Sequence, residues 1–273
     1  MRWLICFCVA LVALTSSGAA QTSHLARLND RDELVGWEGV GRLDRDRRGI
    51  CSAVLIASDL ALTAAHCIHD PETGMPVPTE SLSFRAGFSN GASIAERDVY
   101  LALSHEGYDP TRQPDTENIR HDVALLRLAE PIPVSEADPF ALHPGHLTQD
   151  RLLVASYGRG RMEALSLESR CHLLDRREGV TFFDCNITFG SSGAPVFALA
   201  GDTVRLLSLV SGMATMNGRK LGLGMVLPEI VADLRKEMGR LPAPPVRSRV
   251  RRIGSRAAAA PDGSKFVRVT PRN

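Results

Sequence analysis

The sequence predicts an all-β fold, a sandwich or a barrel, for the central part of the chain. Between residues 36 and 227 the apolar residues come in short runs, which Gly, Pro, Asn or Asp interrupt. Long helical patterns are few in this stretch, as expected for strands joined by turns. The body from residue 21 to residue 239 is long enough for one large barrel or two small ones.

The composition is that of an ordinary globular protein. Of 273 residues, 44% are hydrophobic, and 32 basic residues nearly balance 31 acidic ones. These values exclude a collagen-like, a coiled-coil or a wholly disordered chain.

The first residues form a separate segment, and we predict that residues 1–20 are a secretory signal peptide. Met1 and Arg2 supply positive charge, residues 3–14 are an unbroken apolar run, and small and polar residues follow. The run is too short to cross a bilayer, which needs roughly 20 residues. A membrane anchor is the alternative. No other segment is apolar enough to span a membrane, so we expect a soluble mature protein that is secreted or periplasmic.

Within the body, five apolar runs are the clearest candidate strands. They comprise residues 53–56, 123–128, 151–157, 194–199 and 204–210. Residues 130–139 contain several prolines and acidic residues and resemble a connector between two halves. We therefore divide the body into residues 21–135 and residues 136–239, which no internal repeat relates.

Residues 228–239 predict a short C-terminal helix. Proline occupies its first turn, acidic residues precede basic ones, and Gly239 closes the segment. Its apolar stripe consists of Ile230, Val231, Leu234 and Met238.

Residues 240–273 differ from the body in charge. They contain nine basic residues and one acidic residue, Asp262, and therefore carry a net charge of +8. Their content of proline and alanine makes them poor core material, so we predict a flexible basic tail. The tail either binds a phosphate-rich anionic surface or remains solvated and folds back on an acidic body.

Four cysteines remain after the signal peptide: Cys51, Cys67, Cys171 and Cys185. An even number in an oxidising compartment predicts two disulfides, for which three pairings exist. The short-range pairing closes two loops of similar size, each contributing about 3 kcal/mol in the loop-entropy model. A zinc site is the alternative, but the chain has no Cys-x-x-Cys pair.

Three segments carry chemically interesting side chains. His66 follows an apolar run and precedes Cys67, Asp122 begins a strongly apolar run, and Ser192 lies in Gly-Ser-Ser-Gly. Each alone has a structural explanation, namely a packed histidine, a capping aspartate and a common loop.

Together, the three side chains are what acyl transfer requires. A serine hydroxyl needs a base to remove its proton during attack, and neutral imidazole is such a base. A buried carboxylate fixes the ring tautomer and stabilises the imidazolium. Glycines in the serine turn allow the backbone N–H groups of Gly190 and Ser192 to point at one developing oxyanion.

The segments 51–67, 122–128 and 190–195 resemble the chymotrypsin/trypsin-like serine proteases and are most similar to their secreted bacterial branch. The resemblance extends from about Trp37 to Met238, and Leu-Thr-Ala-Ala-His-Cys is its most specific motif. It implies two antiparallel six-stranded β-barrels with the catalytic triad in the cleft between them. His66 and Asp122 would come from the first barrel and Ser192 from the second, with Cys51–Cys67 as the bridge beside the histidine.

The chain departs from the family at the residue before the nucleophile. Digestive members have an aspartate there, which pairs with a newly cut N-terminus, whereas this chain has Ser191. The sequence Leu34-Val35-Gly36 only faintly resembles a family N-terminus. Our hypothesis is that the oxyanion turn is preformed, or that residues 21–35 control it in another way.

The chain also departs from the family in its candidate specificity pocket. Asn186 stands where trypsin-like enzymes place an acid, and Asp184 is offset by two residues. The expected wall, which includes Ser211 and Met213, has no histidine of the kind that glutamate-specific relatives use. We therefore expect an uncharged pocket. Asn186 also begins a glycosylation sequon, which we interpret as coincidence.

The resulting prediction is a secreted serine endopeptidase that forms an acyl-enzyme on Ser192. Its partner would be a polypeptide substrate; we expect a monomer that requires no nucleic acid, cofactor or metal. The main alternative is a catalytically silent binding protein of the same fold, anchored by its tail. An esterase is less consistent with the sequence because its Gly-x-Ser-x-Gly motif is absent.

Overall fold

The structure is a computed structural model that describes residues 25–46, 49–145, 147, 150–200, 203–216 and 218–243. Among these residues, a compact unit extends to Pro242. The predicted signal peptide and nearly all of the predicted tail lie outside the described residues.

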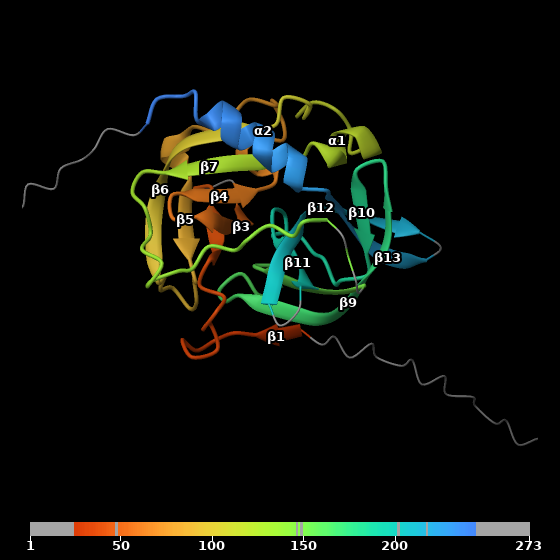
Figure 1. Ribbon diagram of the computed structural model, residues 1–273, viewed down its shortest axis with the longest axis horizontal. Coiled ribbons are helices and arrows are strands. Elements are labelled where there is room, and N and C mark those ends of the chain that lie inside the picture. Colours follow the sequence, from red (N-terminus) through yellow and green to blue (C-terminus); the bar gives the residue numbers. More distant parts are fainter. Residues whose placement is uncertain are drawn as a thin grey trace, which may run out of the picture. The chain divides into compact units, whose positions relative to one another are not determined.

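Within the compact unit the chain forms two β-barrels (Figure 1). The first is a closed barrel of six antiparallel strands, in the order β2-β3-β4-β7-β6-β5. Its strands are β2 (Val40–Asp44), β3 (Ile50–Ala57), β4 (Leu60–Thr63), β5 (Ser83–Ala86), β6 (Ala95–Ser104) and β7 (Ala124–Leu128).

The second barrel is formed by the six strands that follow in the chain. They are β8 (Arg151–Ser156), β9 (Ser166–Arg177), β10 (Val180–Phe183), β11 (Pro195–Ala200), β12 (Thr203–Met216) and β13 (Arg219–Met225). The order is β9-β10-β13-β12-β11-β8, and pairing of β8 with β9 closes the ring. The short strand β1 (Leu25–Arg27) pairs with β9 from outside this ring.

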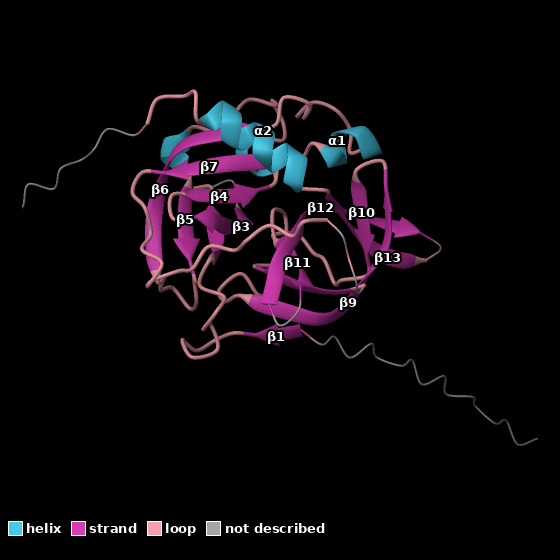
Figure 2. Cartoon of the chain, viewed as in Figure 1, coloured by secondary structure: helices cyan, strands magenta, loops and turns pink. Residues whose placement is uncertain are grey.

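Helices are few and short (Figure 2). They comprise α1 (Thr116–Arg120), α2 (Pro228–Met238) and the 3-10 helices η1 (Ala65–Ile68) and η2 (Thr79–Ser81). The predicted C-terminal helix is α2, whose residues Val231, Leu234 and Met238 are buried while Ile230 is partly buried. None of the helices in the described part of the chain is long and apolar enough to cross a membrane.

The observed strands correct the predicted ranges mainly at β12. The sequence predicts a strand at residues 204–210, but β12 continues to Met216. Residues 211–216 are only half-buried or exposed, so they lack the apolar signal of a strand. They remain extended because they pair with β13, for example Met213 with Gly222.

Three apolar clusters fill the compact unit. One lies within the first barrel and one within the second. The third combines residues of both barrels with the buried face of α2, for example Leu125, Phe197 and Leu234. The two barrels therefore share a core, and segments from both can meet at their junction.

Candidate active site

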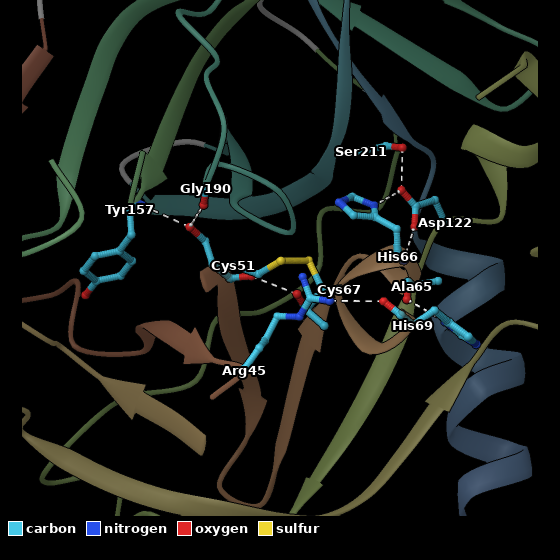
Figure 3. The surroundings of a disulfide bond; sticks show 12 residues. Arg45, Cys51, Ala65, His66, Cys67, His69, Asp122, Tyr157, Gly190 and Ser211 are labelled. Atoms are coloured by element: carbon cyan, nitrogen blue, oxygen red, sulfur yellow. Dashed lines mark hydrogen bonds and ion pairs between the residues drawn. A yellow bond between two sulfur atoms is a disulfide. The ribbon is translucent and has the colours of Figure 1, made fainter. Parts of the chain in front are cut away.

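His66 lies in η1, directly after β4. The next residue, Cys67, forms a disulfide with Cys51 of β3, with a Cα–Cα distance of 6.2 Å. Both cysteines are buried. The bridge thus ties the turn that carries His66 to the neighbouring strand (Figure 3). The second short-range bridge, Cys171–Cys185, also forms.

The imidazole of His66 is held by Asp122. Its Nδ1 lies 2.7 Å from Asp122 Oδ2, and its backbone N–H donates to Asp122 Oδ1 at 2.9 Å. An ionised carboxylate can only accept, so Nδ1 carries the proton and Nε2 has a free lone pair. Burial acts to lower the pKa of His66, but the charge of Asp122 and its hydrogen bond outweigh burial, so the pKa is raised.

Asp122 is a buried carboxylate with three hydrogen bonds. It follows the C-terminal end of α1, and Ser211 of β12 donates from Oγ to its Oδ2 at 2.6 Å. Burial acts to raise the pKa of Asp122, but His66 and the hydrogen bonds outweigh it and lower this pKa. Figure 3 shows Asp122 between His66 and Ser211, which come from different barrels.

Ser192 lies in a turn that glycines make possible. Gly190 and Gly193 have φ values of 87° and 72°, a region that disfavours other residues. A Cβ at Gly190 would lie 2.5 Å from the backbone oxygen of Tyr157. At Gly193 it would lie 2.2 Å from Thr63 Oγ1. Glycine is therefore required at both positions for conformation and for space.

The serine turn of the second barrel is bonded to the first barrel through Ser52. The backbone N–H of Ser52 donates to the oxygen of Ser192 at 2.8 Å, and Ser52 Oγ donates to the oxygen of Gly190 at 3.1 Å. Ser52 Oγ also accepts from the N–H of Tyr157 at 3.0 Å. Because Ser52 follows Cys51, the bridge that holds His66 also holds the strand to which the serine turn is bonded (Figure 3).

The backbone N–H groups of the serine turn fall into two sets. Those of Ser191 and Gly193 donate to the oxygens of Thr188 and Val210. Those of Gly190 and Ser192 make no hydrogen bond with the described residues. These two are the N–H groups that the sequence predicts for an oxyanion hole, and they are available to an incoming oxygen.

The hydroxyl of Ser192 completes the set of candidate catalytic groups. It makes no hydrogen bond with His66 or with any other described residue. The hydrogen bonds of Ser52 nevertheless bring its turn to β3, the strand that the Cys51–Cys67 disulfide ties to the turn carrying His66. Hydrogen bonds between nucleophile and base are often long before substrate binds, so this geometry is compatible with a nucleophilic role.

The three candidate pocket residues have different surroundings. Asn186 is exposed, and its backbone N–H donates to the buried carboxylate of Glu168 at 2.6 Å. Ser211 binds Asp122, and Met213 is 39% exposed. No hydrogen bond among the described residues joins these three. Asp184, the nearby acid, accepts from the N–H of His172 at 2.6 Å.

A metal centre at His66 is incompatible with the bonding of its neighbours. Cys51, His66 and Cys67 place potential ligand atoms within 4.8 Å of one another. The two sulfur atoms are bonded to each other, however, and only a thiolate is an effective metal ligand.

The sequence did not indicate three of the supporting residues. Ser211 appears there as a pocket residue rather than as a partner of Asp122, and Ser52 has no signal apart from its place after Cys51. Glu168 is an ordinary strand residue in the sequence but is buried in the structure. Their roles depend on contacts between segments distant in the chain, which periodicity and motifs do not encode.

Several known proteins are similar to the chain over part of its length. A family model for the trypsin-like peptidase domain matches residues 51–204, which is more than half of the chain. The chain is 27% identical over 143 residues to a trypsin of Phaedon cochleariae, covering 49% of this chain and 51% of that protein. It is 34% identical over 113 residues to the serine protease SP24D of Anopheles gambiae, covering 41% of this chain and 38% of that protein. The chain thus spans about half, or less, of the length of these relatives.

Solved structures show the same fold at low sequence identity. A Glu endopeptidase aligns with a TM-score of 0.66 and 11% identity, over 81% of this chain and 99% of that one. A thermostable serine protease, AL20, from an extremophilic microorganism aligns with a TM-score of 0.60 and 18% identity, over 75% of this chain and 98% of that one. At these identities the alignments establish the two-barrel fold and not the specificity.

Proposed function

The chain belongs to the family of trypsin-like peptidase domains, and on this premise we propose that it is a secreted serine endopeptidase. The observation that carries the proposal is the hydrogen bond of 2.7 Å between His66 Nδ1 and Asp122, which leaves Nε2 as a base. Ser192 is the nucleophile in this proposal, because its turn is bonded to the strand beside the His66 loop.

In the first half of the reaction, Ser192 Oγ attacks the carbonyl carbon of the substrate peptide bond. The proton of the hydroxyl passes to His66 Nε2, and the carbonyl electron pair moves to the oxygen. Asp122 stabilises the imidazolium that results. The N–H groups of Gly190 and Ser192 bind the oxyanion, and their preorganised dipoles act more strongly on it than on the neutral carbonyl.

Collapse of this intermediate breaks the C–N bond. The electron pair returns to the carbonyl, and His66 gives its proton to the leaving amine, which departs with the C-terminal part of the substrate. Water then attacks the ester on Ser192 with His66 again as the base, and the acid product and free Ser192 are formed. The cycle consumes one water molecule and needs no cofactor.

We propose that the side chain before the scissile bond is uncharged. Asn186 is neutral, Met213 is apolar, and Asp184 is bonded to the backbone of His172. Glu168, the other acid beside Asn186, is bonded to the backbone N–H of that residue. Both acids near Asn186 therefore have backbone hydrogen-bond partners, which supports an uncharged pocket.

The remaining features of the proposal rest on the sequence. The predicted signal peptide and the two disulfides support export, either to the medium or to the periplasm. The enzyme would act as a monomer on polypeptides, and the basic residues after Arg240 would attach it to an anionic surface.

A serine-directed fluorophosphonate probe tests the proposal. We expect the mature wild-type protein to be labelled at Ser192 and to cleave members of a mixed peptide library. Ser192→Ala should lose the label, and its kcat should fall by about 10⁴- to 10⁶-fold. A wild-type protein that is folded but neither labelled nor active would contradict the proposal and would favour the silent binding protein.

A further inference from the structure

We infer that Arg161 and Ser156 are positioning residues. They hold the oxyanion turn, which is the serine turn around Ser192 described above, in its active conformation without a cut N-terminus. The inference rests on the proposed function and concerns the same site. It starts from Ser191, the residue before the proposed nucleophile, where digestive members of the family have an aspartate that pairs with an N-terminal ammonium group. Ser191 is completely buried, and its side chain needs a polar partner there.

That partner is Ser156, at the end of β8. Ser191 Oγ donates to Ser156 Oγ at 3.3 Å. Arg161 donates from Nη1 to the same Ser156 Oγ at 2.9 Å and to the Ser156 backbone oxygen at 3.1 Å. The two lone pairs of one hydroxyl are thus taken by Ser191 and by a cation. The positively charged Arg161 is therefore linked to the oxyanion turn through one side chain, that of Ser156.

The segment between Ser156 and Arg161 also contacts the turn directly. The N–H of Arg159 donates to the oxygen of Phe189 at 2.6 Å. A Cβ at Gly158 would lie 2.6 Å from Thr188 Cγ2 and 2.7 Å from Arg161 Nη2. The guanidinium of Arg161 and the side chain of Thr188, at the start of the oxyanion turn, therefore both pack against Gly158. Loss of the guanidinium would remove both a hydrogen-bond donor and a packing surface.

The environment of Arg161 suits a fixed internal cation. Its side chain is half-buried, and burial acts to lower its pKa while the charge of Glu168 acts to raise it. Glu168 is in turn bonded to the N–H of Asn186, in the same loop as Ser191. The guanidinium stays charged throughout the physiological pH range, so its hydrogen bonds do not depend on a titrating amine.

The N-terminal part of the described chain pairs with the second barrel and contributes to the shared core. Residues Leu25–Arg27 pair with β9, and the N–H of Leu28 donates to the oxygen of Leu165. Leu34 is 2% exposed and belongs to the shared core, whereas Val35 is 70% exposed. The segment that faintly resembles a family N-terminus is therefore folded as an internal turn.

The test compares three variants with the mature wild-type enzyme, whose labelling by the fluorophosphonate establishes the proposed function independently. Arg161→Met removes the donors but keeps a long side chain. Ser156→Ala and Ser191→Ala each remove one of the two hydroxyl groups that link Arg161 to the oxyanion turn. We expect Arg161→Met to lower kcat by about 10²-fold, the effect of losing one oxyanion donor. KM should change much less, because the oxyanion turn acts mainly in the transition state.

The matched control is Arg97→Met, which removes another half-buried arginine, on β6 of the first barrel. We expect its kcat to equal that of the wild type. A peptide aldehyde, which forms a tetrahedral oxyanion with Ser192, should bind Arg161→Met about 10²-fold more weakly and Arg97→Met normally. Millimolar methylguanidinium should restore part of the activity to Arg161→Ala and none to an inactive Ser192→Ala.

The pH profile separates positioning from a merely structural role. An N-terminal amine titrates near pH 8, whereas a guanidinium does not titrate below about pH 12. The wild type should therefore keep its kcat between pH 8 and pH 10, and Arg161→Lys should lose activity at alkaline pH as the lysine deprotonates. An alkaline loss in the wild type, unchanged kcat in folded Arg161→Met, or equal losses in Arg161→Met and Arg97→Met would each overturn the inference. If Arg161→Met does not fold, a wild-type kcat in Ser156→Ala would overturn it.

Discussion

At His66, the two ring nitrogens have different surroundings, and this difference determines which of them can act as a base. Nδ1 is engaged by a carboxylate that is 3% exposed, while the side chain of His66 remains 32% exposed. Nδ1 is thus fixed in orientation, whereas Nε2 makes no hydrogen bond with the described residues. A carboxylate without further partners could rotate, but Ser211 and the N–H of His66 hold Asp122 in place.

The raised pKa of His66 makes a prediction for the pH dependence of kcat/KM. Below this pKa the imidazole is protonated and cannot accept the serine proton, so activity should rise with pH and reach a plateau. Because Asp122 raises the pKa above its ordinary value of 6.5, the midpoint of the rise should lie above pH 6.5. A pH series from 5 to 9 with an uncharged peptide substrate measures this midpoint.

The variant Asp122→Asn provides the comparison for this profile. Without the carboxylate the pKa of His66 should fall, which moves the midpoint to lower pH, and kcat should drop by about 10⁴-fold. A flat profile from pH 5 to pH 8 in the wild type would contradict a role for His66 as base. The same holds for a midpoint that Asp122→Asn leaves unchanged.

The residues that the sequence could indicate are those with a distinctive neighbour along the chain. His66 precedes a cysteine and Ser192 lies between glycines, so both stand out locally. Ser211 and Arg161 do not, because their partners Asp122 and Ser156 are known only once the strands are arranged. The polar supports of a site are satisfied by contacts between elements, and a single sequence carries no record of such contacts.

Among the elements, the serine turn is the one that most restricts its sequence. It must approach β3 and β4 so closely that the Cα of Gly193 faces Thr63 and the backbone oxygen of Ser52. The N–H of Gly193 also donates to the oxygen of Val210 at 2.8 Å. The turn therefore has no room to move toward or away from the first barrel without losing hydrogen bonds.

Gly193→Ala should for this reason damage both stability and catalysis. Its Cβ would lie 2.2 Å from Thr63 Oγ1 and 2.4 Å from the oxygen of Ser52, at a φ of 72°. The control is Gly91→Ala, at a φ of 86° with no atom within 4 Å of the new Cβ. The control carries backbone strain alone, about 1–2 kcal/mol. Gly193→Ala should lose about 1–3 kcal/mol more, from overpacking.

Urea unfolding and kcat measure the two effects separately. We expect kcat of Gly193→Ala to fall, since displacement of the turn moves Ser192 from His66, and kcat of Gly91→Ala to stay normal. Equal losses of unfolding free energy in both variants would mean that the close contact with Ser52 and Thr63 has no energetic weight.

The clearest strand predictions fall on elements whose residues are buried on both faces of the sheet. All residues of β7 except Arg127 are buried, and residues 123–128 were predicted as a strand. The predictions did not include β9, in which most side chains are partly exposed, or β13, which contains two glycines. Those strands owe their place to pairing with neighbours in the barrel rather than to their own apolar pattern.

At the scale of the whole compact unit, the C-terminal helix α2 contacts the first barrel, although it follows the second in the chain. Helix α2 follows the second barrel but packs on the first, where Arg127 Nη2 donates to the oxygen of Met238 and Arg235 Nη2 to that of Ile56, each at 3.1 Å. Figure 1 shows α2 lying across β7. With the shared core beneath it, this arrangement makes the two barrels depend on one another.

The final prediction is that Leu234→Ala destabilises both barrels together. Leu234 is 1% exposed in the shared core, and its truncation should cost about 2–5 kcal/mol of unfolding free energy. Lys236→Ala, on the exposed face of α2, is the control and should change it by less than about 0.5 kcal/mol. Urea unfolding is followed by far-UV circular dichroism and by the fluorescence of Trp37. The ring centroid of Trp37 lies 5.5 Å from that of Phe197 in the second barrel.

With residues 1–20 removed, Trp37 is the one tryptophan of the chain, so its signal reports on the junction of the barrels alone. Because the shared core joins the barrels, we expect both signals to follow a single transition in each protein, shifted to lower urea in Leu234→Ala. Two separate transitions, with only one of them shifted, would mean that each barrel folds independently. In that case the hydrogen bonds between the serine turn and Ser52 would have to form after folding, and the candidate active site could be lost while both barrels remained intact.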